Sequence, residues 1–135
     1  MEKNGKKIIW VNGCFDILHI GHLKMLEYAK SLGDILVVGI DSDSRIKTLK
    51  GEKRPVNKQE DRAEFLLSIK YVDEVRIFDS EESMISHIES SSADLIVVGE
   101  EYSTKKVVGS HLAPVVFFPR VPGFSTTQVI EKEAL

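Results

Sequence analysis

Five short runs of β-branched and aliphatic residues alternate along this chain with longer stretches that carry apolar residues at helical spacing. The runs are predicted strands at Ile8–Val11, Ile35–Ile40, Glu74–Phe78, Leu95–Val98 and Val115–Phe118. The predicted helices span Leu23–Leu32, Asp41–Lys50, Glu60–Ile69, Ser83–Ser90 and Ser125–Lys132, and Gly51–Lys58 is predicted to be a loop. Apolar strands that alternate with helices are typical of a parallel sheet with crossover helices. The pattern therefore predicts an α/β fold, a five-stranded parallel sheet with helices on both faces.

The size and composition of the chain fit a small globular protein. Its 135 residues are enough for one domain, which we expect to span 1–135 and to bury about two-thirds of the surface that the unfolded chain exposes. Hydrophobic residues make up 42% of the chain, but no apolar run approaches the ~20 residues that cross a bilayer. The segment Met1–Lys7 lacks the apolar stretch of a signal peptide. We therefore expect a cytoplasmic protein with no membrane partner.

Charge and cysteine content argue against further classes of protein. A formal net charge of -3 does not supply the basic face with which proteins hold nucleic acid, so no nucleic-acid partner is expected. The single cysteine, Cys14, cannot form an internal disulfide, which fits a reducing compartment. A redox protein of flavodoxin-like architecture would share the alternation of strands and helices, but it does not predict the paired histidines His19 and His22.

The segment between the first predicted strand and the first predicted helix carries the strongest functional signal. Gly13 lets the backbone approach a ligand, and a helix that starts nearby presents unpaired N–H groups and the positive end of its dipole. His19 and His22 lie three residues apart, so both side chains point to the same side of a helical turn, with Gly21 between them. A single histidine at a helix start is more often an ordinary polar residue. The whole run instead predicts a site where two imidazoles face one anion.

Polar and basic residues also follow other predicted strands. Such segments are Asp41–Arg45, Gly99–Tyr102 and Arg120–Thr127. A basic cluster in the same region consists of Lys47, Lys50, Lys53 and Arg54. In an open parallel sheet, ligands bind outside the carboxyl ends of the strands, at the point where the strand order reverses. We therefore expect these groups to converge on phosphate.

Other kinds of site are less well supported by the sequence. A single cysteine and the absence of a further His/Cys cluster disfavour a metal centre, so no metal held by the protein alone is predicted. No Ser-His-Asp or Cys-His arrangement with an orienting partner is evident. Cys14 is therefore interpreted as a small residue beside the ligand and not as a nucleophile. The predicted donors form a site that stabilises negative charge.

Several segments resemble one family of enzymes, in the same order and with similar spacing. They are Gly13-Cys14-Phe15-Asp16, His19-Ile20-Gly21-His22, Lys50–Asn57 followed by Asp61-Arg62, Tyr71–Val75 and Arg120–Thr127. The sequence is similar to the small nucleotidyltransferases related to glycerol-3-phosphate cytidylyltransferase and to the adenylyltransferase domain of bifunctional heptose-phosphate enzymes. The resemblance covers almost the whole chain. It implies a Rossmann-like domain of the nucleotidyltransferase α/β phosphodiesterase type that forms homodimers, with Tyr71–Val75 as part of the interface.

The resemblance also implies catalytic roles. The residues concerned are His19, His22, Lys50 and Arg120. The two histidines would contact the triphosphate and stabilise the transition state, with Lys50 and a second cation, Lys47, on the other side of the phosphates. The arginine would bind phosphate, and the Ser125-Thr126 pair would hold the leaving pyrophosphate at the start of the last helix.

The other nucleotide-binding positions implied by the resemblance lie at two strand ends. They are Gly13, Cys14, Phe15 and Asp16 after the first strand, and Gly99 and Glu101 after the fourth. Two of them have an alternative interpretation of about equal weight. Asp16 is also a candidate for stabilising its own loop, and Glu101 for an exposed acidic residue with no ligand.

Arg54, Arg62 and Lys70 are implied as substrate-binding residues. Arg62 lies on a predicted helix, where pairing with a neighbouring carboxylate is the alternative. Lys70 stands where glycerol-phosphate cytidylyltransferases have an arginine, and lysine lacks bidentate recognition of phosphate. Arg120, in contrast, is similar to the cytidylyltransferase pattern. The longer match, Lys50–Asn57 with Arg62, favours ATP as the donor and a phosphorylated sugar such as heptose 1-phosphate as the acceptor.

Two alternatives for the function stay open. One is a CTP-dependent enzyme that acts on glycerol 3-phosphate or a similar polyol phosphate, and the other is a non-catalytic nucleotide-binding module. Mg²⁺ is expected to accompany the nucleoside triphosphate with few protein ligands, because it keeps several waters and binds phosphates. Nucleotidyl transfer depends on in-line positioning and charge neutralisation, so it needs no nucleophilic side chain.

Overall fold

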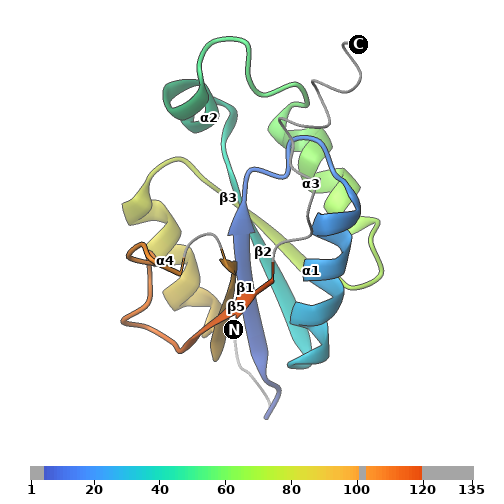
Figure 1. Cartoon of the computed structure of the whole chain (residues 1–135), viewed down its shortest axis with the longest axis vertical. Helices are drawn as coiled ribbons and strands as arrows, with labels where there is room; N and C mark the ends of the chain where they lie inside the picture. The colour runs from blue at the N-terminus through green and yellow to red at the C-terminus, as the bar shows by residue number, and fades with distance from the viewer. Residues whose placement is uncertain (1–4, 101–102, 120–135) are drawn as a thin grey trace.

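A computed structural model describes residues 5–100 and 103–119 (Figure 1). Its strands are β1 (Ile8–Gly13), β2 (Ile35–Asp41), β3 (Glu74–Phe78), β4 (Leu95–Gly99) and β5 (Val115–Phe118). Its helices are α1 (Ile20–Ser31), α2 (Asp43–Lys50), α3 (Gln59–Leu67) and α4 (Glu81–Ser91). All five predicted strands form, and four of the five predicted helices do. The fifth predicted helix, Ser125–Lys132, lies outside the described residues.

The strands form one parallel sheet in the order β3-β2-β1-β4-β5. From β1 the chain proceeds outward through β2 to β3, and it then crosses back to add β4 and β5 on the other side of β1. The order therefore reverses between β1 and β4, and the ligand crevice of such a sheet lies at the carboxyl ends of these two strands. Gly13 is the last residue of β1 and Gly99 the last of β4, so the structure brings both predicted positions to this edge.

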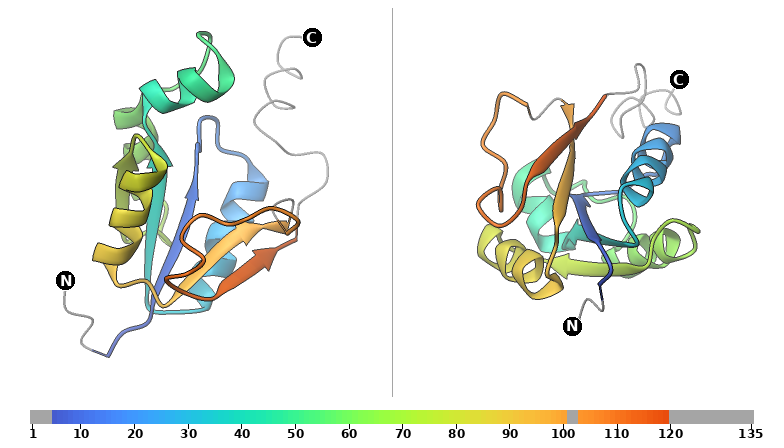
Figure 2. Two further views of the ribbon diagram at one scale, coloured as in Figure 1. Left: turned by 90° about the vertical axis from the view of Figure 1, so that its left-hand side faces the viewer. Right: turned by 90° about the horizontal axis from the view of Figure 1, so that it is seen from below.

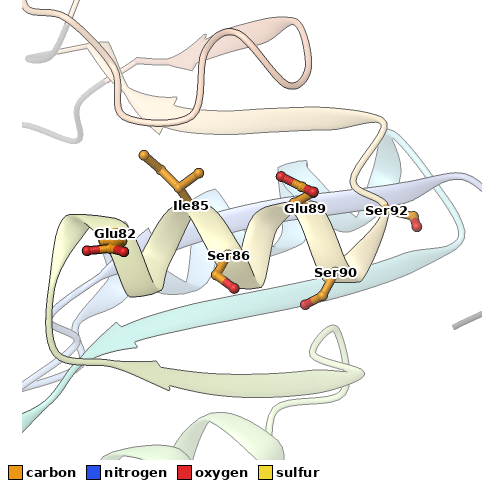
Figure 3. A pocket seen from close by; sticks show the side chains of 6 residues that line it. All are labelled: Glu82, Ile85, Ser86, Glu89, Ser90 and Ser92. Atoms are coloured by element: carbon orange, nitrogen blue, oxygen red, sulfur yellow. The ribbon is translucent and has the colours of Figure 1, made fainter.

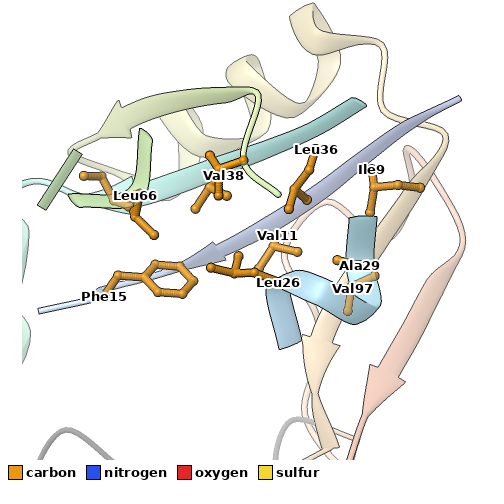
Figure 4. Close-up of a cluster of buried hydrophobic side chains, with 11 residues drawn as sticks. Ile9, Val11, Phe15, Leu26, Ala29, Leu36, Val38, Leu66 and Val97 are labelled. Carbon is orange, nitrogen blue, oxygen red and sulfur yellow. The ribbon is translucent and has the colours of Figure 1, made fainter. Parts of the chain in front are cut away.

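Helices cover both faces of the sheet, as the sequence predicts. Helices α1 and α3 lie on one face and α4 on the other (Figures 1 and 2). Along β1 the side chains alternate: Ile9 and Val11 pack toward α1, whereas Ile8 and Trp10 pack toward α4. Figure 4 shows the larger of the two clusters, in which side chains of the sheet meet those of α1 and α3. Strands β1 and β2 are apolar along most of their length because helices cover the sheet on both faces.

All four described helices begin at residues other than those predicted, and α1 and α2 are the two that begin beside the site. Helix α1 starts at Ile20 instead of Leu23, because His19 acts as its N-cap and the first turn forms directly after it. Helix α2 starts at Asp43 instead of Asp41. Asp41 is the last residue of β2, and the side chain of Ser42 caps the helix by accepting from the Arg45 N–H. Both helices therefore start immediately beside the carboxyl edge of the sheet.

Replacing Gly39 with alanine is expected to destabilise the fold by roughly 1–3 kcal/mol. A Cβ atom at this position in β2 would lie 2.4 Å from Cζ2 of Trp10 and 3.1 Å from Cε1 of Phe78, both of which are fully buried. The Trp10 ring cannot move away without disturbing the cluster under α4. Urea unfolding measures the change, with Ser86→Ala on the exposed side of α4 as the control. An unchanged unfolding midpoint for Gly39→Ala would contradict this packing.

Candidate active site

The loop between β1 and α1 is held in shape by a buried phenylalanine. Phe15 has a φ of 49°, in the left-handed region that side chains rarely adopt, at a cost of about 1–2 kcal/mol. Its ring is buried and lies so close to Gly13 that a Cβ atom on that residue would come within 3.1 Å of it. The centroid of the ring lies 5.1 Å from that of the His22 ring. Burial of the ring offsets the backbone cost. Phe15 therefore fixes the path of the loop and packs against the ring of His22.

The two predicted histidines lie together at the start of α1. Their rings stack with centroids 3.9 Å apart. Nδ1 of His19 accepts from the Gly21 N–H at 3.1 Å, and Nδ1 of His22 accepts from the His19 N–H at 3.2 Å. These two bonds form a capping box, in which each imidazole satisfies a backbone donor at the helix start. Because both Nδ1 atoms are acceptors, each neutral ring carries its proton on Nε2.

Both histidines are neutral near pH 7. Burial, together with the nearby charges of His19 and Lys50, lowers the pKa of His22 to about 4 from its ordinary value of 6.5. Burial also lowers the pKa of His19. The pair is therefore a set of neutral Nε2–H donors beside the N-terminus of α1. Such donors stabilise developing negative charge without a change of their own protonation state.

The free energy of unfolding is expected to fall as the pH drops from 6.5 toward 4, because of His22. Between its ordinary pKa of 6.5 and its folded pKa of about 4, the unfolded chain binds a proton that the folded protein excludes. Stability therefore rises with pH across this window and reaches its full contribution above pH 6.5, a change on the order of 3 kcal/mol. Urea unfolding at pH 7, 6 and 5 measures it. His22→Gln does not titrate and should remove this part of the slope, and equal slopes in both proteins would contradict the assignment.

The predicted lysines lie on α2, whose last turn contains Lys47 and Lys50. Both are exposed. The charge of Lys50 acts on the pKa of His22 and on that of Cys14, so its amine lies close to both side chains. The structure thus brings Lys50 together with the histidine pair. The neutral imidazoles at the start of α1 and the cationic amine from the end of α2 therefore lie near each other.

Cys14 lies directly after β1 and keeps its thiol protonated. Burial is the main cause that raises its pKa, followed by the carboxylate of Asp41, whose Oδ2 lies 3.5 Å from Sγ. The charge of Lys50 opposes these effects without reversing them. A thiol with a raised pKa is a poor nucleophile. The environment thus argues against a nucleophilic role for Cys14.

Asp16 holds the loop 51–58 against the histidine loop. Its carboxylate is fully buried and accepts from the N–H groups of Val56 and Asn57, each at 2.8 Å, and from Nε of Arg54 at 3.1 Å. Its carbonyl oxygen accepts from the side chain of Asn57. The oxygens of the carboxylate therefore point into the protein. Of the two roles considered for Asp16, stabilisation of the loop is the one that this geometry supports.

Arg62 is placed differently from the expectation that it meets a substrate. Its side chain is fully buried. Nη1 donates to the carbonyls of Cys14 at 2.9 Å and Asp41 at 2.7 Å, and Nε donates to the carbonyl of Asn57 at 3.0 Å. Nη2 donates to Oδ1 of Asp43 at 2.7 Å. An acceptor phosphate has no access to these donors, whereas the alternative, pairing with a neighbouring carboxylate, is present.

Lys70 lies at the opposite end of the sheet from the histidines. It precedes β3, and the next residues in the chain are fastened to the start of β2, where Asp73 exchanges two hydrogen bonds with Leu36. Its amine approaches the ring of Tyr71 at 5.2 Å. Within one copy of the chain, the structure does not bring Lys70 together with the other predicted substrate-binding residues. Its place before a parallel strand puts it at the amino edge.

Other predicted residues lie outside the described part of the chain. They are Glu101, Arg120, Ser125 and Thr126. Two residues that shape the site have no role of their own in the prediction: Asp43, which lies within the predicted segment Asp41–Arg45, and Gln59. They bond each other through backbone and side chain at 2.8 and 2.9 Å. Asp43 follows a buried strand, which is a signal for the carboxyl edge, but nothing in the sequence pointed to Gln59.

The site does not coincide with the open depression on α4. That depression is lined by Glu82, Ile85, Ser86, Glu89, Ser90 and Ser92 (Figure 3). None of the predicted site residues contributes to it. Within residues 5–100 and 103–119 there is also no group of three or more His, Cys, Asp or Glu side chains that could hold a metal ion. In the same ranges no helix has the length and apolar character needed to cross a membrane.

A parallel sheet whose order reverses beside a helix start with paired donors defines a nucleotide-binding α/β protein. The chain belongs to the cytidylyltransferase-like family, whose model matches residues 10–132. It is thus a nucleotidyltransferase by class, as the sequence motifs predict. Two similar proteins are the bifunctional protein HldE of Campylobacter fetus, 47% identical over 133 residues, and that of Helicobacter pylori, 47% identical over 135 residues. Each alignment covers 98% of this chain.

The chain spans only 29% of the length of the Campylobacter fetus protein and 28% of that of Helicobacter pylori. Among solved structures, it is similar to the lipopolysaccharide core biosynthesis protein from Thermoplasma volcanium, with a TM-score of 0.68 and 26% identity over 87% of this chain and 98% of that one. It is also similar to pantoate-β-alanine ligase from Francisella tularensis, with a TM-score of 0.67 over 96% of this chain and 66% of that one. At 16% identity, the second likeness shows the fold alone.

Proposed function

We propose that this chain transfers a nucleoside monophosphate from a nucleoside triphosphate, with ATP favoured, to a phosphorylated sugar such as heptose 1-phosphate. A phosphate oxygen of the acceptor attacks the α-phosphorus, the bond from that phosphorus to the bridging oxygen of the β-phosphate breaks, and pyrophosphate leaves. The observation that carries the proposal is the pair of neutral Nε2–H imidazoles at the start of α1, close to Lys50. These groups suit an α-phosphate whose negative charge shifts during transfer.

Each described side chain would have a distinct part in the reaction. His19 and His22 would donate hydrogen bonds to the phosphate oxygens from one side, and Lys50, with Lys47, would neutralise charge from the other. Arg54 supports the choice of a phosphorylated acceptor, because its Nη2 atom is buried and has no hydrogen-bond partner within the described ranges. Arg120, Ser125 and Thr126 are proposed to hold the β- and γ-phosphates, as the resemblance implies.

Mg²⁺ is proposed to arrive with the triphosphate. The carboxylates nearest the histidine loop, Asp16 and Asp41, are engaged by Arg54 and Arg45. This donor set fits an ion that is held mainly by the phosphates and water. When bound, Mg²⁺ would neutralise part of the charge of the triphosphate. The protein would supply the imidazole and amine donors around it.

The identity of the acceptor separates the two catalytic candidates. The similarity to HldE proteins and the segment Lys50–Asn57 favour a sugar phosphate and ATP. Arg120 favours the alternative of CTP with glycerol 3-phosphate or a similar polyol phosphate. A non-catalytic nucleotide-binding module would keep the fold but lack turnover. A homodimer is part of the proposal, because the family resemblance implies it.

Pyrophosphate release by the purified chain with Mg²⁺ tests the proposal. ATP and CTP are each combined with heptose 1-phosphate and glycerol 3-phosphate, and reactions without an acceptor measure background hydrolysis. We expect release with ATP and heptose 1-phosphate. Release only with CTP and glycerol 3-phosphate would select the alternative. Nucleotide binding without release in any combination, extended to further sugar and polyol phosphates, would leave only the binding module.

A further inference from the structure

Arg62 joins three segments that end at the candidate site. The carbonyl of Cys14 belongs to the histidine loop, that of Asp41 to the end of β2, and that of Asn57 to the loop 51–58. These bonds, together with one to Asp43, use four of the five N–H groups that a guanidinium possesses. The side chain comes from α3, a fourth element. One buried group thus sets the relative positions of backbone segments that are far apart in the sequence.

The fourth bond of Arg62 extends this connection to α2. Asp43 is the first residue of α2, and its Oδ1 accepts both from Nη2 of Arg62 and from the N–H of Gln59, the first residue of α3. The N–H of Asp43 donates in return to Oε1 of Gln59. Of the eight residues of α2, Ile46 is the one that is buried, so polar contacts at its start carry much of its attachment. The lysines lie at the other end of this short helix.

We infer that Arg62 is a positioning residue that sets the distance between the two sides of the phosphate site. On one side it fixes the loop that leads to His19 and His22, through the Cys14 carbonyl. On the other side it fixes the start of α2, which carries Lys50, through Asp43. The inference rests on the proposed function, because it assumes that both sides contact one triphosphate. It replaces the expected role of Arg62 as a ligand of the acceptor.

The chemistry of the contacts explains why arginine is needed here. The acceptors of Arg62 lie in several directions around one planar group, and a guanidinium reaches them with donors in a fixed fork. A lysine at the same position keeps the charge but has a single nitrogen, so it cannot bond all four oxygens. Arg62→Lys therefore keeps a buried cation beside Asp43 and releases part of the backbone. That makes it a suitable test of positioning.

A double-mutant cycle on ATP affinity tests the inference without requiring turnover. Isothermal titration calorimetry with ATP and Mg²⁺ is applied to the wild type, Lys50→Ala, Arg62→Lys and the double variant. In the wild type, loss of the Lys50 cation is expected to weaken ATP binding about tenfold. In the Arg62→Lys background, where α2 is no longer held in place, the same loss should weaken it less than about twofold. Lys50 and Arg62 do not share a hydrogen bond within the described residues, so a purely structural role of Arg62 predicts that the effects of the two substitutions on ATP affinity multiply.

Arg76→Lys is the matched control. Arg76 joins β3 to α4 by a bond to the carbonyl of His87, and it also pairs with Glu74 in its own strand. It is thus a partly buried arginine that, like Arg62, has a carboxylate and a carbonyl as partners. The described bonds of Arg76 do not reach the loops of the site. Lys50→Ala should therefore weaken ATP binding about tenfold in the Arg76→Lys background as well. If Lys50→Ala weakened ATP binding by less than about twofold in both the Arg62→Lys and the Arg76→Lys backgrounds, the reduction would reflect a general loosening of the protein and would overturn the inference.

Other outcomes of these measurements would overturn the inference or the proposed function. Multiplying effects in the Arg62→Lys cycle overturn the inference, and so does a rise in KM for the acceptor with unchanged ATP affinity, since that is the behaviour of an acceptor ligand. If Arg62→Lys does not fold, Asp43→Asn takes its place, because it keeps the oxygen but removes the charge, and the same coupling is expected. ATP binding without turnover in the wild type would overturn the proposed function alone. Absence of ATP binding in the wild type would overturn both.

Discussion

Replacing His22 with alanine is expected to lower the rate of pyrophosphate release by about 10²–10³-fold, the usual cost of removing one preorganised donor to a developing negative charge. The substitution removes the Nε2–H donor and the Nδ1 acceptor of the His19 N–H. It also removes the ring that packs on Phe15. The fold should persist, because the helix keeps its other cap bond, from Gly21 to His19. Steady-state pyrophosphate release measures the effect, and circular dichroism checks the fold.

His22→Gln separates the two roles of this imidazole. Glutamine at the third helical position accepts from the N-cap N–H in ordinary capping boxes, so the cap bond of His22 should be retained. Its amide also offers an N–H donor, although with different geometry. We therefore expect the stability of the wild type and a smaller loss of rate, about tenfold. If His22→Ala kept more than about a fifth of the wild-type rate, the role of His22 as a phosphate donor would be wrong.

Replacing Asp16 with alanine is expected to destabilise the protein by roughly 3–5 kcal/mol, the range for breaking a buried ion pair from one side. The carboxylate is fully buried, and its removal leaves three donors without their acceptor. One of them is the guanidinium of Arg54, whose side chain is mostly buried. The loop 51–58 would lose its main attachment to the histidine loop. Urea unfolding at pH 7 measures the change.

Two further variants serve as comparisons for the loss of stability in Asp16→Ala. Asp16→Asn keeps one oxygen as an acceptor but loses the charge, so it should cost less than Asp16→Ala. Asp79→Ala changes an exposed aspartate after β3 and should lie within about 0.5 kcal/mol of the wild type. A small effect of Asp16→Ala, similar to that of Asp79→Ala, would mean that the loop does not depend on the buried carboxylate.

The parallel sheet could be predicted because its strands have a simple pattern. Residues such as Val37, Val38, Ile96 and Val97 are buried between two helical layers, so their strands contain few polar residues and stand out in the sequence. The choice of the carboxyl edge as the predicted site follows from this order, since polar residues after successive parallel strands meet at one edge. The placement of His19 and His22 at a helix start was predictable for the same reason.

The structural details of the site depend on contacts that the sequence does not contain. The predicted start of α1 is wrong because histidine is not among the common capping residues. The cap depends on two imidazoles, His19 accepting from a backbone N–H of the first turn and His22 accepting from the N–H of His19. The burial of Arg62 was not predictable, because three of its acceptors are backbone carbonyls that leave no trace in residue type. The residue type and position of Asp16 fit both a loop-stabilising and a ligand-binding role, and only its hydrogen-bond partners distinguish the two. Lys70, in contrast, could have been placed, because it precedes a parallel strand.

The central place of β1 has a consequence for synthesis of the chain on the ribosome. As soon as β2 has emerged, β1 can pair with it, but Ile9–Val11 finds its second partner only in Leu95–Val97. Until then one edge of this apolar strand is open, with its backbone groups unpaired. Nascent chains that end between Phe78 and Leu95 are therefore expected to bind chaperones that recognise exposed apolar strands. Release from them should coincide with the emergence of β4.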